Sequence, residues 1–71
     1  MFCIKVKIKS TKNTEFLLDN IIYEYEFKNI NGYLIGTFYC LELFDMFDYD
    51  FKQNKKKYNH NINYEYTISL D

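Results

Sequence analysis

Several residue types that small domains ordinarily use are missing from this chain. Its 71 residues include no proline, alanine or arginine, and only two glycines. Phe, Tyr, Asn, Ile and Lys, whose codons are A+T-rich, account for 40 of the 71 residues. The composition therefore indicates a strongly A+T-biased genome, such as that of a phage, another virus or a low-GC bacterium. The absence of arginine also excludes bidentate recognition of guanine by a guanidinium group.

Long hydrophobic runs and a disulfide framework are absent as well. No run approaches the ~18 residues that span a bilayer, and the N-terminal residues MFCIKVKIKS lack the separate apolar block of a signal peptide. Cys3 and Cys40 permit at most one bridge, so we expect two reduced thiols that act as small buried hydrophobic groups. These features predict one domain, residues 1–71, in the cytoplasm (of a host cell if a phage encodes the chain), with no membrane role.

Alternating apolar and polar residues predict most of the sheet, because a strand with one buried face has a period of two. Asn31-Gly32 separates two such segments and is typical of a type I′ hairpin turn. Gly36, in the second arm of that hairpin, indicates a bulge or a close approach. Residues 14–19 fit either one helical turn capped by Thr14 or the start of the next strand. The predicted strands are residues 2–9, 20–28, 33–44 and 62–70.

The segment of residues 45–57 fits a strand or a helix. Aromatic residues alternate with polar ones as in a strand, but Asp45 could cap a helix, and the acids before the lysines suit the helix dipole. Phe44, Phe47 and Phe51 would share one face of that helix. We therefore predict an α+β fold, β-β-β-α-β, with a small antiparallel sheet of about four strands and one helix near 45–56. The alternative is an all-β five-stranded meander or barrel.

Acidic residues gather in this predicted helix, and no basic residue interrupts them between residues 42 and 50. Such a group can engage a basic protein by charge complementarity, and exposed aromatic neighbours would supply most of the affinity. The same acids also suit the first turns of an ordinary helix. The predicted partner-binding residues are Glu42, Asp45, Phe47, Asp48, Tyr49 and Asp50.

Lysines form two groups, one along the first strand and one at the end of the predicted helix. If the two groups adjoin, lysine could neutralise phosphates while tyrosine stacks on bases. The net charge of −1 weakens this alternative, and lysines on a strand also protect it against edge-to-edge aggregation. The alternative nucleic-acid contacts are Lys5, Lys7, Lys9, Lys55, Lys56 and Lys57.

Residue patterns for catalysis or metal binding are not visible in the sequence. The single histidine, His60, has no zinc-type spacing to either cysteine. Asp48 and Asp50 lack the glycine-bearing loop that a calcium site uses. Nucleophilic catalysis needs a base beside the nucleophile, and no spacing supports such a pair. We expect no cofactor, no metal and no enzymatic activity.

Fifteen aromatic residues are too many for one sheet layer of this length to bury. Some are expected at an interface, where tyrosine is enriched, and we expect a homodimer formed by strand pairing or a tyrosine face. The function expected by elimination is that of a phage- or mobile-element-type protein that binds and inhibits a host nucleic-acid-handling defence protein, as an anti-CRISPR does, by steric occlusion. The alternatives are a lysine- and tyrosine-based nucleic-acid-binding accessory protein and a self-assembling structural subunit.

Overall fold

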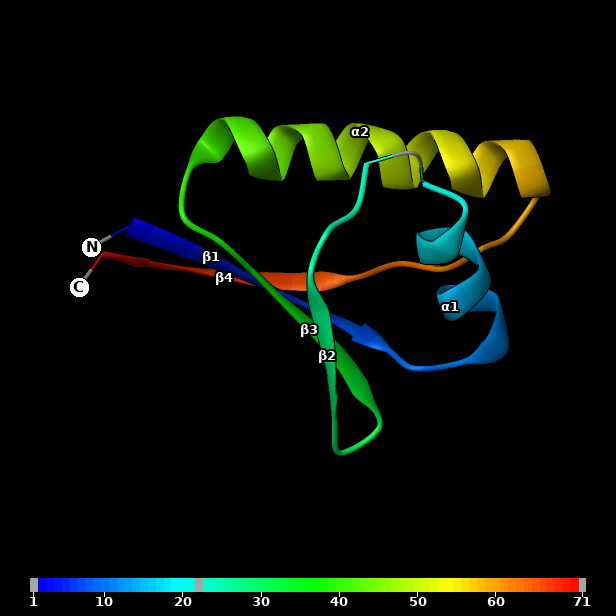
Figure 1. The fold of residues 1–71 in the computed structure, drawn as a ribbon, viewed down its shortest axis with the longest axis horizontal. Coiled ribbons are helices and arrows are strands. Elements are labelled where there is room, and N and C mark those ends of the chain that lie inside the picture. The colour runs from blue at the N-terminus through cyan, green and yellow to red at the C-terminus, as the bar shows by residue number, and fades with distance from the viewer. Residues whose placement is uncertain (1, 22, 71) are drawn as a thin grey trace.

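A computed structural model describes residues 2–21 and 23–70 of the chain, which fold into four strands and two helices. The elements are β1 (Phe2–Lys9), α1 (Lys12–Asp19), β2 (Phe27–Ile30), β3 (Tyr33–Phe38), α2 (Leu41–Tyr58) and β4 (Glu65–Leu70). The strands form one antiparallel sheet in the order β2-β3-β1-β4, and both helices lie on the same side of it (Figure 1). The predicted α+β class is confirmed, and the all-β alternative is wrong.

The fold consists of two β-α-β units, β1-α1-β2 and β3-α2-β4, whose strands interleave in the sheet. This is the split β-α-β arrangement. β3 lies between β1 and β2, and β1 lies between β3 and β4. One face of the sheet is thus covered by helices, while the other has no helix over it (Figure 1). β2 and β4 are the two edges.

β1 lies inside the sheet and shows the predicted alternation. Ile4, Val6 and Ile8 are at most 1% exposed and face the helices, whereas the lysines between them are exposed on the opposite face. Burying these three side chains contributes roughly 1.5–3 kcal/mol each. β1 therefore contributes apolar side chains to the core on one face of the sheet. Its lysines lie on the other face, which neither α1 nor α2 covers and which we call the open face.

The β2–β3 hairpin is confirmed, with Ile30 paired to Tyr33 across the predicted turn. Asn31 and Gly32 have φ angles of 53° and 83°, as a type I′ turn requires. Gly36 is opposite Phe27, and a Cβ added at Gly36 would lie 2.6 Å from the Phe27 ring. This glycine therefore marks a close approach.

The strand predicted over residues 20–28 is shorter than expected and begins only at Phe27. Residues 23–26 lie outside the sheet and lead toward the level of α2 (Figure 1), and Ile22 of the predicted strand lies outside the described residues. Ile21 is buried, and the Tyr25 ring packs edge-on against Phe47 of α2, with centroids 5.4 Å apart. Ile21 and Tyr25 thus point inward as predicted, although Tyr25 packs on a helix rather than on a sheet, whereas Tyr23 is 50% exposed.

Residues 14–19, left open between a turn and a strand, belong to α1, which starts earlier than either possibility. Thr11, not Thr14, is the N-cap, and its hydroxyl accepts a hydrogen bond from the Thr14 N–H at 3.1 Å. Thr14 is itself buried, and its hydroxyl donates to the Lys9 carbonyl at 2.9 Å. Leu17 is fully buried in the core, so the side of α1 that carries it faces inward.

α2 confirms the predicted helix but begins at Leu41, so residues 41–44 are helical and not part of a strand. Its N-cap is Cys40 rather than Asp45, and the Cys40 side chain makes no capping hydrogen bond. Phe44, Phe47 and Phe51 face the sheet and form the centre of the core. Their spacing of three and four residues is that of one helical face, which explains why the helix includes Phe44.

The two cysteines are both free, as predicted. Cys3 is half-buried in β1, but Cys40 is exposed at the start of α2. The expectation of two buried thiols is therefore wrong for Cys40, because the residue caps a helix instead of continuing β3 into the core.

Candidate functional site

The side of α2 that points away from the sheet combines carboxylates with exposed apolar side chains. Glu42, Asp45, Met46 and Tyr49 follow the i, i+3, i+4, i+7 spacing of a single helical face. Met46 is 44% exposed and Tyr49 is 65% exposed, and both acids are exposed as well. We call these four residues the α2 outer face.

Further apolar side chains flank the α2 outer face at the start of the helix. Leu41 is 55% exposed, Leu43 is 38% exposed and Tyr39, just before the helix, is 63% exposed. Single exposed apolar residues are common on protein surfaces, but several close together around a helix end commonly mark an interaction site.

Phe47, one of the predicted partner-binding residues, is fully buried. Its ring contacts Phe38, with centroids 5.3 Å apart, and Phe51, at 5.6 Å. The helix turns this side chain toward the sheet, so it stabilises the core and is not accessible to a partner.

Asp48 lies on the side of α2 that faces the residues before β4, and it is held by two groups. The Tyr64 hydroxyl donates a hydrogen bond to it, and the Lys52 ammonium lies 2.9 Å from its second oxygen. Burial raises the pKa of Asp48, but the bonds from Tyr64 and Lys52 and the lysine charges outweigh burial and lower it overall.

Asp50 occupies the other flank of the helix and binds a tyrosine there. The Tyr25 hydroxyl donates to its Oδ2 at 2.8 Å. Burial, followed by this hydrogen bond and the Asp50 charge, raises the pKa of Tyr25 above its ordinary value, and the same causes act on Tyr64 beside Asp48. Asp48 and Asp50 thus tie α2 to its neighbours on both sides, whereas Glu42, Asp45 and Tyr49 remain exposed.

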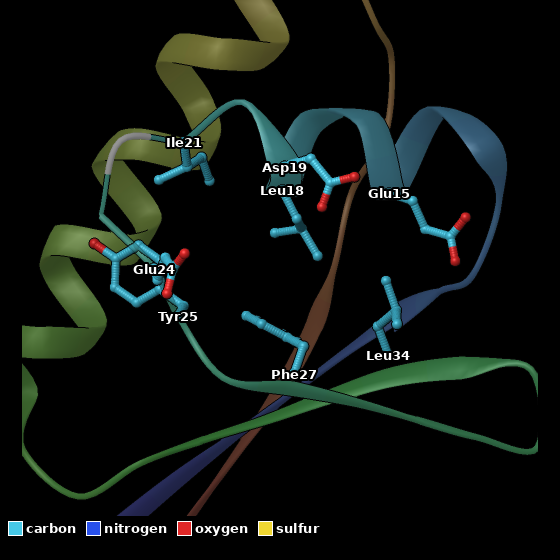
Figure 2. A pocket seen from close by; sticks show the side chains of 8 residues that line it. All are labelled: Glu15, Leu18, Asp19, Ile21, Glu24, Tyr25, Phe27 and Leu34. Carbon is cyan, nitrogen blue, oxygen red and sulfur yellow. The ribbon is translucent and has the colours of Figure 1, made fainter.

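A hollow of about 850 Å³ opens between α1, the segment before β2, and β3. In Figure 2, Leu18, Phe27 and Leu34 point toward one another across it. Its lining also includes the carboxylates of Glu15, Asp19 and Glu24 but no basic residue. Because carboxylates repel phosphate, this hollow does not suit nucleic acid.

The open face of the sheet gathers lysines from two strands. Lys5, Lys7 and Lys9 of β1 lie on this face, and Lys28 of β2 joins them because it is paired to Ile35, the neighbour of Lys7. The Lys7 ammonium lies 4.2 Å from the centre of the Tyr33 ring. Lys28 is not among the predicted contacts, since strand order is needed to place it beside β1.

The second predicted lysine group lies apart from the first. Lys55, Lys56 and Lys57 form the last turn of α2, in the helical layer, while the β1 lysines are on the opposite side of the sheet. Lys55 donates to the Asn63 side chain at 2.7 Å, and the Lys57 ammonium lies 5.2 Å from the centre of the Tyr58 ring. The two groups therefore do not form one basic surface.

Sequence reasoning missed Met46, Leu41 and Leu43 as surface residues. It placed the helix start at Asp45 and treated residues 33–44 as a strand, so the outer face of the first helical turn was not recognised. The signal that could have revealed this face is the spacing of Glu42, Asp45, Met46 and Tyr49, which places all four on one side of a helix.

Metal-type clusters of His, Cys, Asp and Glu are not found in the part of the chain that the structure describes. His60 packs against Phe16, with ring centroids 6.0 Å apart. Neither described helix has the length and apolar character needed to cross a bilayer. Comparison with protein-family models, curated proteins and solved structures finds no match to the chain.

Proposed function

We propose that this chain is a phage- or mobile-element-type inhibitor that binds a host nucleic-acid-handling defence protein, as an anti-CRISPR does, and blocks it by steric occlusion. The observation that carries the proposal is the α2 outer face. There, Met46 and Tyr49 are exposed beside Glu42 and Asp45 on the 18-residue helix α2. A helical face that leaves apolar side chains exposed to solvent suits contact with another protein.

The chemistry of the α2 outer face indicates the kind of partner. Its two free carboxylates favour a positively charged surface, which proteins that bind nucleic acid present. Tyr49 and Met46 would supply the buried contacts, because aromatic side chains and methionine are enriched where interfaces are best packed. Covering a functional surface of the partner is the simplest means of inhibition for such a face, because it requires only contact.

The proposal is tested by producing the chain in bacterial strains that each carry one active nuclease-based defence system. Phage plating efficiency is then measured, and the bound host protein is captured on the tagged chain. We expect protection of phage in at least one strain. Met46→Asn combined with Tyr49→Ser should remove both protection and capture, because it replaces the exposed apolar contacts while leaving the core intact.

The matched control is Lys5→Gln with Lys28→Gln, two exposed changes on the open face of the sheet. This variant should protect phage as well as the original chain does. Protection that survives loss of Met46 and Tyr49 but disappears in the lysine variant would contradict the proposed surface. Absence of protection across all strains would contradict the inhibitor function itself.

Nucleic-acid binding is the second candidate function, and the open face of the sheet favours it. Lys5, Lys7, Lys9 and Lys28 lie there with Tyr33, without a helix covering them (Figure 1). Single-stranded DNA or RNA binds to such sheet faces through lysine contacts with its phosphates and aromatic stacking on its bases. Glu26 and Glu65 also border this face, and they reduce its positive potential.

Fluorescence anisotropy with a labelled single-stranded oligonucleotide tests this second function. If it holds, Lys5→Gln with Lys28→Gln lowers the slope of log affinity against log salt by about 0.7 per lysine removed. Lys56→Gln, in the helical layer, should leave the slope unchanged. Equal slopes for all three proteins would contradict binding at the open face.

A further inference from the structure

β4 is an edge strand whose side chains are all exposed. It pairs with β1 on one side and has no neighbouring strand on the other within the described sheet. Tyr66, Ile68 and Leu70 are opposite Val6, Ile4 and Phe2, so they lie on the helix side of the sheet. Yet they are 52%, 57% and 82% exposed, and we call these three residues the β4 ledge.

The two edges of the sheet differ in how they are protected against pairing. β2 has only four residues and carries Lys28, and a short, charged strand resists the addition of another strand. β4 has six residues, and its last five, YTISL, contain no charge, proline or glycine. An exposed edge of this kind, with an apolar ledge, is a template for strand addition.

We propose that a second copy of this chain pairs its β4 with β4 of the first, antiparallel and about a two-fold axis. The two four-stranded sheets then form one continuous sheet with the helices of both copies on the same side. Strand pairing satisfies the edge N–H and C=O groups, and the two β4 ledges meet to form one apolar strip. The interface is isologous, the arrangement that closes a dimer.

The sequence of β4 is complementary to itself in this arrangement. With Thr67 opposite its own copy, Tyr66 lies opposite Ile68, an aromatic and β-branched pair that stabilises antiparallel strands. Glu65 lies opposite Ser69, so the two Glu65 carboxylates are at opposite ends of the pair and do not repel each other directly. The net charge of −1 per copy gives little electrostatic repulsion between the two copies.

A copy of the same chain fits this edge better than a charged partner does. The β4 ledge and the alternate residues Thr67 and Ser69 offer no charge with which to select a basic or acidic segment. The α2 outer face points away from the sheet and remains free in the pair, so this inference does not depend on the proposed function. Each dimer would present two α2 outer faces.

Light scattering and sedimentation of the complete chain test the dimer. We expect a mass of twice 8.8 kDa at micromolar concentration, falling to 8.8 kDa on dilution. Ile68→Lys should raise the dimer dissociation constant by about tenfold or more, because it puts two like charges into the apolar strip. Ile30→Lys is the matched control, since Ile30 is 50% exposed on the other edge strand, and it should dimerise normally.

Hydrogen exchange on the unaltered chain decides the case if Ile68→Lys does not fold. The amides of residues 66–70 should exchange more slowly as protein concentration rises, whereas those of β2 should not change. A mass of 8.8 kDa throughout, a dimer unaffected by Ile68→Lys, or protection that is independent of concentration in residues 66–70 would each overturn the inference.

Discussion

The three aspartates of α2 show how single residues with the same charge take different roles. Asp48 and Asp50 accept hydrogen bonds from Tyr64 and Tyr25, whereas Asp45 is exposed. Reversing the charge of Asp48 or Asp50 would therefore disturb the attachment of α2 as well as any partner contact. Only exposed acids such as Asp45 can test binding without loosening the fold.

The tyrosines that bind these aspartates predict a loss of stability in alkali. Burial and the hydrogen bonds raise the pKa values of Tyr25 and Tyr64 above the ordinary value. Their stabilising contribution is complete below the unfolded pKa of about 10 and is lost as pH rises through the folded pKa. The free energy of unfolding, measured by denaturant titration, should fall above about pH 10. Tyr25→Phe with Tyr64→Phe should flatten this fall, and an unchanged slope would contradict the assignment.

Gly36 is a residue of β3 with little free space beside it. Gly36→Ala places a methyl group about where the Phe27 ring lies, since a Cβ there would be 2.6 Å from the ring. We expect the free energy of unfolding to fall by about 1–3 kcal/mol, as overpacking typically costs. Gly36→Ala with Phe27→Leu should recover part of this loss, because the smaller side chain removes the clash. A Gly36→Ala variant as stable as the original chain would refute the close packing.

The start of α2 lacks a hydrogen bond from its N-cap side chain. Cys40 has the extended backbone of an N-cap but makes no capping hydrogen bond. Cys40→Asp should stabilise the fold by about 1 kcal/mol, since aspartate can accept from the first-turn N–H groups and suits the helix dipole. Thermal unfolding measures this gain, and Cys40→Ala is the control that should show none. If both variants melt together, the N-cap assignment is in error.

Elements with strong local signals were predictable from the sequence, and those shaped by tertiary contacts were not. β1 alternates throughout, and Asn31-Gly32 fixes the turn of the β2–β3 hairpin by backbone conformation alone. Residues 23–26 alternate just as clearly, but Tyr25 binds Asp50 across the fold and draws the segment away from the sheet. Periodicity alone does not show which element a side chain packs against, nor, at Tyr23, whether it is buried.

At the scale of the whole molecule, the order of the strands decides what the surfaces can do. Both helices cover one face (Figure 1), which separates the β1 lysines from Lys55 and leaves β4 as a bare edge. Strand order depends on contacts between residues far apart in the chain, so the sequence could not predict it. The acidic segment was predictable as a region, but its division into exposed and bonded carboxylates required the structure.

The central claim, that the α2 outer face binds a basic partner, is tested most directly by calorimetric titration of the captured host protein at two salt concentrations. Glu42→Lys with Asp45→Lys should weaken binding about tenfold or more, roughly 1.4 kcal/mol. The affinity of this variant should also depend less on salt, because the two carboxylates that attract the basic partner have been removed. Lys5→Gln with Lys28→Gln should bind like the original chain. Unchanged affinity in the Glu42 and Asp45 variant, together with loss of binding in the lysine variant, would contradict the claim.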